Sequence, residues 1–203
     1  MASATLPKRL FDLVGATAGL LAFSPVMAAI AGAIVLEDGW PVLFRQERLG
    51  RDRRPFAILK FRSMRHGRIT RVGRMLRATG LDELPQFVNI LRGDMSAVGP
   101  RPLTAADVMR LGWMAPRCDF RWRVLPGLTG LAQVSEVRSG RLSLGLDRWY
   151  VARQSLALDL RLVAVSFAIN ALGKQRVRQL LARPRRAYAI ADDACLKRVD
   201  PQR

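Results

Sequence analysis

The sequence predicts a mainly α-helical membrane protein with one small β-hairpin. An apolar stretch of 24 residues without a formal charge, residues 13–36, lies near the N-terminus. Two short apolar runs within residues 41–61 flank a charged, glycine-containing turn, which is typical of a hairpin. Apolar residues at helical spacing recur in residues 84–92 and 148–172. At 203 residues, the chain fits one ordinary domain with its own core.

The charge of the chain predicts a negatively charged partner. The 34 lysines and arginines outnumber the 16 acidic residues and give a formal net charge of +18. This excess suits nucleic acid, anionic lipid and phosphate esters alike. Most of the basic residues are arginine, whose planar guanidinium group binds phosphate well, although genomic codon bias explains this composition equally well.

Cysteine and histidine contents limit the kinds of site. Cys118 and Cys195 match neither a metal-binding spacing nor a disulfide framework, which is typical of a reducing compartment. His66 is the one histidine in the sequence, which argues against a metal site built from histidines.

Residues 13–36 are long enough to cross a membrane. At about 1.5 Å of rise per residue, the stretch covers a hydrocarbon core about 30 Å thick. It is too long for the apolar part of a cleaved signal peptide, and no small-residue cleavage site introduces a plausible mature domain. Ser24-Pro25 lies in its middle, where proline removes a helix hydrogen bond, so we expect a kink.

Basic residues flank both ends of the apolar segment. Lys8 and Arg9 precede it, and five arginines follow between residues 45 and 54. The positive-inside tendency favours a cytoplasmic location for both flanks, as in a re-entrant helical hairpin. Because proline also bends spanning helices, a re-entrant and a spanning helix both stay open on these grounds. Asp12 has three interpretations, which are a pair with Arg9, a helix cap and a solvated surface position.

After the hairpin, arginine recurs every three residues, close enough to helical spacing to predict a cationic stripe. Solvated surface explains most such stripes, but this one leads into residues 79–86, so phosphate capture carries comparable weight. The members of the stripe are Arg65, Arg68, Arg71, Arg74 and Arg77.

Residues 84–92 are expected to form a short amphipathic helix, with Pro85 in its first turn and Gly93 closing it. Asp82 and Glu83 then lie at the helix N-terminus. The amides and the dipole at that end stabilise anions, so we expect these carboxylates to stay ionised with a phosphate beside them. A helix cap is the competing interpretation.

Two glycine-rich segments are predicted to be irregular. Residues 93–102 place Arg101 between two prolines, and a rigidly presented arginine suits bidentate phosphate binding. Residues 126–133 contain glycines that permit close approach of the backbone to a ligand, or simply a packed loop. A long helix is expected from Arg148 to about residue 172, suited to a bilayer surface or to core packing.

Six sequence blocks together resemble the small monotopic phosphoglycosyl transferases of bacteria, often called bacterial sugar transferases. They stand in the order of that family and span residues 8 to about 172. The blocks are KRLFD (8–12), SP (24–25), KFRSM (60–64), LDELPQ (81–86), GDMSAVGPRP (93–102) and PGLTG (126–130).

The resemblance implies a re-entrant membrane helix bent at Ser24-Pro25 (1–40) and a cytosolic helical catalytic domain with a hairpin (41–181). The alternation of charges and small residues after the catalytic domain predicts a flexible tail (182–203). The resemblance also implies a location on the cytosolic face of the bacterial inner membrane, among anionic lipids. The oligomeric state stays open, with a homodimer as one option.

The resemblance further implies a magnesium-dependent reaction in two steps. Asp82 would attack the sugar-bearing phosphate of a UDP-sugar and release UMP, and polyprenyl (undecaprenyl) phosphate would then take the phospho-sugar. Glu83 would support the metal and the geometry, so that Asp82 and Glu83 form the Mg²⁺ site. This would be the first membrane step of a glycan or exopolysaccharide pathway.

Phosphate binding is implied for four basic residues, namely Arg77, Arg101, Lys60 and Arg62.

Two positions depart from the family pattern and bear on the choice of nucleotide-sugar donor. Leu125 stands where a basic residue is common, and Ser135-Glu136 where Asn-Gly is frequent.

Two alternatives from other classes remain to be weighed. A basic nucleic-acid-binding protein would explain the charge but not the apolar segment, so we expect no nucleic-acid partner. A non-catalytic membrane scaffold would not need arginines spaced around Asp82 and Glu83.

Overall fold

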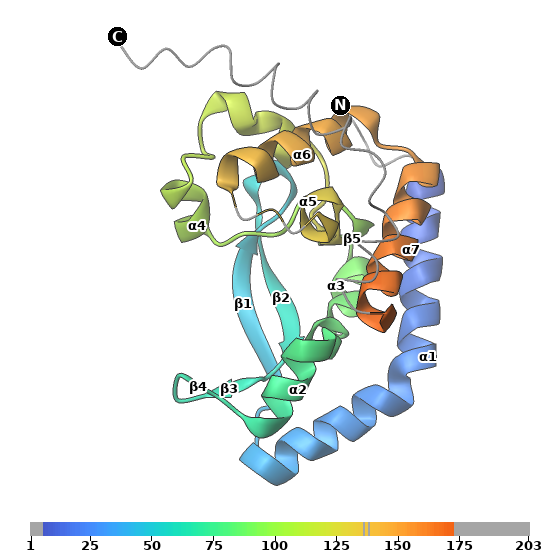
Figure 1. The fold of residues 1–203 in the computed structure, drawn as a ribbon, viewed down its shortest axis with the longest axis vertical. Helices are drawn as coiled ribbons and strands as arrows, with labels where there is room; N and C mark the ends of the chain where they lie inside the picture. The colour runs from blue at the N-terminus through green and yellow to red at the C-terminus, as the bar shows by residue number, and fades with distance from the viewer. Residues whose placement is uncertain (1–5, 136, 138, 173–203) are drawn as a thin grey trace.

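A computed structural model of the chain describes residues 6–135, 137 and 139–172, and the predicted tail (182–203) lies outside these residues. Helices dominate the fold, and the short strands pair two by two (Figure 1). The α-helices are α1 Leu6–Asp38, α2 Arg71–Thr79, α3 Gln86–Arg92, α4 Ala105–Arg110, α5 Leu131–Val134, α6 Gly140–Arg153 and α7 Leu156–Leu172. The 3₁₀ turns are η1 Arg51–Arg53, η2 Leu81–Glu83 and η3 Pro116–Arg123. The strands are β1 Leu43–Leu49, β2 Pro55–Phe61, β3 Met64–Arg65, β4 Arg68–Ile69, β5 Ser96–Val98 and β6 Gly127–Thr129.

Helix α1 contains the apolar segment and is bent. Its 33 residues include Pro25, and Figure 1 shows two straight parts joined at an angle, as the sequence predicts. The Ser24 hydroxyl donates to the carbonyl of Leu21 at 2.9 Å, one turn before the proline. By length and composition α1 is able to cross a membrane, and 11% of its most apolar window is buried in the protein.

Buried polar contacts attach the N-terminal half of α1 to the rest of the protein. Lys8 pairs with Asp159 of α7 at 2.6 Å, and both side chains are buried. The Asp12 carboxylate accepts hydrogen bonds from the Ser96 hydroxyl at 3.0 Å and the Ala97 amide at 2.9 Å. Arg9 donates to backbone carbonyls of α3. None of the three interpretations of Asp12 was therefore right, because its partners lie 84 and 85 positions away.

The C-terminal end of α1 is attached to the start of α2. The Glu37 carboxylate accepts from the Arg71 and Val72 amides at 2.7 and 2.9 Å, which satisfies two free N–H groups at that helix end. Asp38 pairs with Arg62 at 3.1 Å and with Arg65 at 3.0 Å. Both ends of α1 thus contact one and the same body.

The predicted β-hairpin is confirmed. Strands β1 and β2 pair antiparallel from Leu43 opposite Phe61 to Leu49 opposite Pro55. In this register, even-numbered residues of both strands share one face of the hairpin. Ile58 and Phe61 of β2 are buried in clusters that include residues of α1 and α3, so the hairpin joins the membrane helix to the rest of the core.

The cationic stripe is helical only in part. Arg71, Arg74 and Arg77 lie on α2, but Arg65 and Arg68 belong to the small β3–β4 hairpin. His66 and Gly67 form its turn with positive φ angles of 47° and 77°, a conformation that interrupts any helix.

Two further predictions were wrong. Segments 93–102 and 126–133 are not wholly irregular, because β5 and β6 pair in parallel and α5 follows β6. A Cβ on Gly127 would overlap the Gly99 backbone nitrogen, so these glycines let two backbones meet, as in the packed-loop interpretation. The long C-terminal helix is two helices, since the backbone leaves the helical conformation at Gln154 (ψ 123°).

Candidate active site

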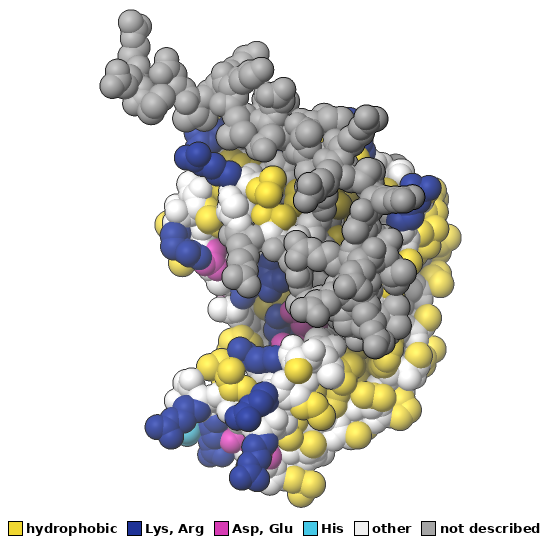
Figure 2. All heavy atoms as spheres, in the orientation of Figure 1, with side chains coloured by type: hydrophobic (Ala, Val, Ile, Leu, Met, Phe, Trp, Pro, Cys, Tyr) yellow, Lys and Arg dark blue, Asp and Glu magenta, His cyan; other side chains and the backbone are white. Residues whose placement is uncertain are grey.

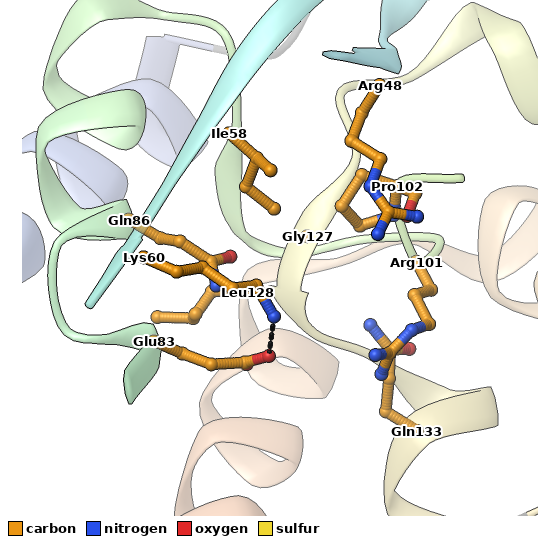
Figure 3. A pocket seen from close by; sticks show the side chains of 10 residues that line it. All are labelled: Arg48, Ile58, Lys60, Glu83, Gln86, Arg101, Pro102, Gly127, Leu128 and Gln133. Atoms are coloured by element: carbon orange, nitrogen blue, oxygen red, sulfur yellow. Dashed lines mark hydrogen bonds and ion pairs between the residues drawn. The ribbon is translucent and has the colours of Figure 1, made fainter. Parts of the chain in front are cut away.

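A pocket lies between the hairpin and the loops that follow β5 and β6. Lys60, Glu83 and Gln86 line one side of it, and Arg48, Arg101 and Gln133 line the other (Figure 3). Figure 2 shows the same face hollowed at mid-height, with basic side chains in and around the hollow. Polar and cationic groups from five separate segments of the chain therefore converge here.

The acidic pair lies on the η2 turn, where Glu83 lines the pocket and Asp82, its neighbour, is not among the lining residues. Gly80 ends α2 in the left-handed conformation (φ 73°), and the tight turn Leu81–Glu83 leads directly to Pro85 and α3. Gly93 closes α3 in the same conformation, as the sequence predicts. Glu83 Oε1 accepts from Lys60 Nζ at 2.5 Å, so the hairpin and the acidic turn are joined by an ion pair.

Asp82 is a carboxylate in unfavourable surroundings. Burial, followed by the charge of Glu83, raises its pKa above the ordinary value, while Lys60 and Arg77 oppose this shift. A helix N-terminus would lower the pKa of a carboxyl group. The pKa of Asp82 is raised instead, because α3 starts four residues later and burial dominates. An anion that is poorly solvated is a stronger nucleophile than a well-hydrated one.

Arg48 lines the pocket but was not predicted as a site residue. In the sequence it was only one of the arginines that flank the membrane segment. Burial lowers its pKa, and the charge of Arg101 lowers it further. Two guanidinium groups held close enough to repel each other create a place for an anion. The signal was available in the hairpin register, since Arg48, Ile58 and Lys60 are even-numbered and share the face that lines the pocket.

The four basic residues expected to bind phosphate do not all reach the pocket. Lys60 and Arg101 line it. Arg77 donates from Nε to the Ser63 hydroxyl at 2.9 Å and acts electrostatically on Asp82. Arg62 instead donates to the carbonyls of Asp38 and Gly39 at 3.0 and 2.6 Å, contacts that anchor the end of α1.

Residues 3–172 match the protein family described as bacterial sugar transferase. The chain belongs to this family. The match confirms the resemblance carried by the six sequence blocks, and the bacterial sugar transferase is accordingly an enzyme of the transferase class. The nucleic-acid-binding and scaffold alternatives lose their support.

Similar proteins include several sugar-phosphate transferases. The bacterial sugar transferase is 42% identical to UDP-glucose:undecaprenyl-phosphate glucose-1-phosphate transferase of Caulobacter vibrioides, over 78% of this chain and 67% of that protein. It is 39% identical to UDP-N-acetylgalactosamine-undecaprenyl-phosphate N-acetylgalactosaminephosphotransferase of Aeromonas hydrophila, over 77% of this chain and 41% of that one. It is 37% identical to exopolysaccharide production protein PSS of Rhizobium leguminosarum, over 77% and 90%. The chain therefore spans about two fifths of the Aeromonas protein and nearly all of the Rhizobium one.

The acidic pair of this bacterial sugar transferase fits a magnesium ion. Among the residues that the structure describes, no three histidine, cysteine or acidic side chains form a metal-binding group. Mg²⁺ commonly takes one or two carboxylates and completes its shell with substrate phosphates and water, so the adjacent carboxylates of Asp82 and Glu83 suffice.

Proposed function

We propose that this bacterial sugar transferase moves a sugar-1-phosphate from a UDP-sugar to undecaprenyl phosphate and releases UMP. One observation carries the proposal, namely that Glu83 of the acidic turn lines one pocket with Lys60, Arg48 and Arg101, while the neighbouring Asp82 feels the charges of Glu83 and Lys60. Such a pocket suits a diphosphate and a carboxylate nucleophile together. The names of the Caulobacter and Aeromonas relatives describe this reaction.

In the first step, a carboxylate oxygen of Asp82 attacks the sugar-bearing phosphorus. An aspartyl-phosphate bond forms, the bond to the bridging oxygen breaks, and UMP leaves with that oxygen and its electron pair. Attack of one anion on another is costly, and Lys60, Arg48 and Arg101 lower that cost by neutralising the diphosphate. Arg77, which acts on the Asp82 carboxylate, limits the rise of its pKa so that the ionised form stays available.

In the second step, a phosphate oxygen of undecaprenyl phosphate attacks the same phosphorus. The new bond produces a polyprenyl diphosphate sugar, and breaking the aspartyl-phosphate bond restores the Asp82 carboxylate. Splitting the transfer in this way lets donor and acceptor use the same cationic pocket in turn.

Asp82 and Glu83 would hold Mg²⁺ in this scheme. The ion would neutralise charge on the phosphate oxygens. Lys60 keeps one Glu83 oxygen at 2.5 Å and so orients that carboxylate independently of any ion.

The arrangement of α1 supports a re-entrant rather than a spanning membrane helix. Lys8 and Asp12 at one end, and Glu37 and Asp38 at the other, all bind the same body. A straight helix of 33 residues is about 50 Å long, and a spanning helix would place its two ends on opposite sides of a hydrocarbon core about 30 Å thick. In the re-entrant arrangement, both ends instead lie on the cytosolic face of the inner membrane, where UDP-sugars are found.

The exposed surface of α1 supports the same placement. Leu10, Val14, Leu21 and Leu36 are all more than half exposed, and Figure 2 shows apolar side chains along the outer edge of the molecule. The acceptor phosphate lies at the headgroup plane, so an enzyme seated there meets it directly. We place the reaction at the first membrane step of a glycan or exopolysaccharide pathway, which the name of the Rhizobium relative supports.

The reaction is tested with purified protein, Mg²⁺, undecaprenyl phosphate and a panel of UDP-sugars that begins with UDP-glucose. We expect UMP release, and a protein adduct of one phospho-sugar in the intact mass when the acceptor is omitted. Asp82→Asn should abolish both signals. Asp52→Asn is the matched control, because Asp52 lies on the exposed η1 turn. Turnover by Asp82→Asn would refute the covalent assignment.

The topology is tested with single cysteines at residues 3 and 52, in a background where Cys118 and Cys195 are serine. In sealed, right-side-out vesicles, both positions should be protected from a membrane-impermeant thiol reagent. Labelling at one of the two positions would establish a spanning helix instead.

A further inference from the structure

The loop that carries Arg101 accepts hydrogen bonds at four consecutive carbonyl groups, from Pro100 to Leu103. The Gly127 amide donates to the Pro100 carbonyl at 2.9 Å, and the Leu49 amide donates to the Leu103 carbonyl at 2.9 Å. Between them, the Arg121 guanidinium donates to the Arg101 carbonyl, and Arg48 reaches the Pro102 carbonyl at 3.4 Å. Four consecutive carbonyls therefore have donors from three different segments, namely β1, β6 and η3.

Arg121 differs from the other donors because it is a buried charge. Its side chain is 3% exposed, and its Nε atom donates to Asp147 of α6, also 3% exposed, at 2.9 Å. Its guanidinium group lies 5.1 Å from the centre of the Trp113 ring and 5.2 Å from that of Trp122. We call these four side chains, Arg121, Asp147, Trp113 and Trp122, the arginine cage.

A buried ion pair is not needed to hold a core together. Apolar residues of similar volume often stabilise a fold equally well or better. What apolar residues lack is the hydrogen-bond donor that Arg121 presents to the Arg101 carbonyl. The arginine cage therefore supplies a hydrogen bond to the Arg101 backbone that apolar packing alone does not supply.

Arg101 also needs such an anchor on electrostatic grounds. Burial lowers the pKa of Arg48 and the charge of Arg101 lowers it further, so the two guanidinium groups repel each other, while Asp107 and Glu83 oppose this shift. Without an anchor, the loop would relieve this repulsion by moving Arg101 away from the pocket. Because the loop is already held in place, binding of the UDP-sugar does not have to reorganise it.

We propose that Arg121 is a positioning residue for substrate phosphate, which holds Arg101 beside Arg48 through the arginine cage. The proposal rests on the proposed function for the identity of the donor. Arg121 touches no substrate in this arrangement and acts through the main chain of Arg101.

The decisive variant replaces the buried pair as a unit, with Arg121→Met and Asp147→Leu together. This avoids leaving Asp147 as an unpaired buried charge, which would itself destabilise the fold. We expect the KM for the UDP-sugar to rise roughly tenfold, with kcat changed less than about threefold, because uniform binding is lost. In an Arg101→Ala background, the same pair of substitutions should add less than about twofold, since coupled residues are not additive.

The matched control is Arg53→Met with Asp119→Asn. Arg53 also pairs with a carboxylate and lies 5.8 Å from the Trp122 ring, but it makes no contact with the Arg101 loop among the described residues. We expect its KM for the donor to stay within about twofold of wild type. An equal rise in both double variants would overturn the proposal, because it would show a general effect of the η3 region.

Arg121→Lys provides a second route should the double variant fail to fold by circular dichroism. Lysine keeps the charge but lacks the planar fork that serves Asp147 and the Arg101 carbonyl together, so its KM should be intermediate. A wild-type KM in this variant would refute the positioning role.

Binding of UDP alone, measured by calorimetry, separates this proposal from the proposed function. The cage double variant should bind UDP roughly tenfold more weakly than wild type, whether or not turnover occurs. Absence of UMP release from wild type would contradict the proposed function, whereas wild-type UDP affinity in the cage variant would contradict the role of Arg121.

Discussion

Asp82 is a residue whose charge opposes folding. Because its pKa is raised in the folded protein, its contribution to stability is present at low pH, where it is protonated, and is lost as pH rises through the folded pKa. At neutral pH, Asp82→Asn should therefore unfold at the same temperature as wild type or higher, while its activity is lost. Differential scanning fluorimetry in detergent measures this, with Asp52→Asn as the reference. A lower Tm would show that the carboxylate is structural.

The same pKa shift predicts a pH dependence. In the protein without Mg²⁺, the Asp82 carboxyl should therefore titrate at a higher pH than an ordinary aspartate. Glu83→Gln removes the second cause of the shift, so we expect Asp82 to titrate at a lower pH in that variant than in wild type. NMR of carboxyl-labelled protein in Mg²⁺-free detergent solution measures the displacement, with Asp82→Asn to assign the signal, and an unmoved titration would contradict the role of Glu83.

Single residues were predictable where the chain itself carries the pattern. Asp82, Glu83 and Lys60 lie in short sequence blocks, and the structure brings them together as expected. Asp12 was not predictable, because nothing local reveals a partner 84 residues away. Arg62 lies in the same block as Lys60 but just beyond the end of β2, and its contacts go to the carbonyls of Asp38 and Gly39 at the end of α1. Its role in phosphate binding stays a prediction.

At the scale of elements, the β5–β6 pair depends on the absence of side chains. A Cβ on Gly127 would overlap the backbone of Gly99, so Gly127→Ala should disrupt the pair and with it the loop that carries Arg101. We expect a loss of about 3 kcal/mol or more, or no folded protein. Gly145→Ala is the control, because nothing lies within 4 Å of a Cβ there and alanine favours the helix by about 0.5–1 kcal/mol. Urea or thermal unfolding in detergent compares the two.

Elements were predicted where periodicity is long enough to be detected. The seven-residue strands of the β1–β2 hairpin and the turn between them give a clear signal, and so does α3 with Gly93 at its end. Strands β5 and β6 have three residues each, which is too short for a periodic pattern to be detected. They pair Ser96 with Gly127, 31 positions away. The break between α6 and α7 has no glycine or proline to mark it, so apolar content alone predicted one long helix.

For the molecule as a whole, insertion into lipid and attraction to anions should be separable by salt. A protein held by charge alone is released from membranes at high ionic strength. Because α1 exposes apolar side chains along its length, we expect the protein to need detergent even in 1 M salt, a condition that screens charges beyond about 3 Å. Recovery in the soluble fraction after such a wash would contradict insertion.

The arrangement of parts was the least predictable property. Composition and length establish a membrane helix and a basic domain, but not that one domain binds both ends of the helix. That arrangement depends on partners far apart in sequence, such as Lys8 with Asp159 and Glu37 with the first amides of α2. Each contact is local in space and invisible in a window of neighbouring residues.

The pair of Lys8 with Asp159 has a consequence for how the protein is made. The two residues are 151 positions apart, so at about 5–20 residues per second the ribosome delivers the second roughly 8 to 30 seconds after the first. During that interval the Lys8 ammonium has no Asp159 carboxylate to pair with. This contact therefore forms only after α7 has been synthesised. A nascent chain stopped before residue 156 should be bound to the membrane yet readily cut by protease.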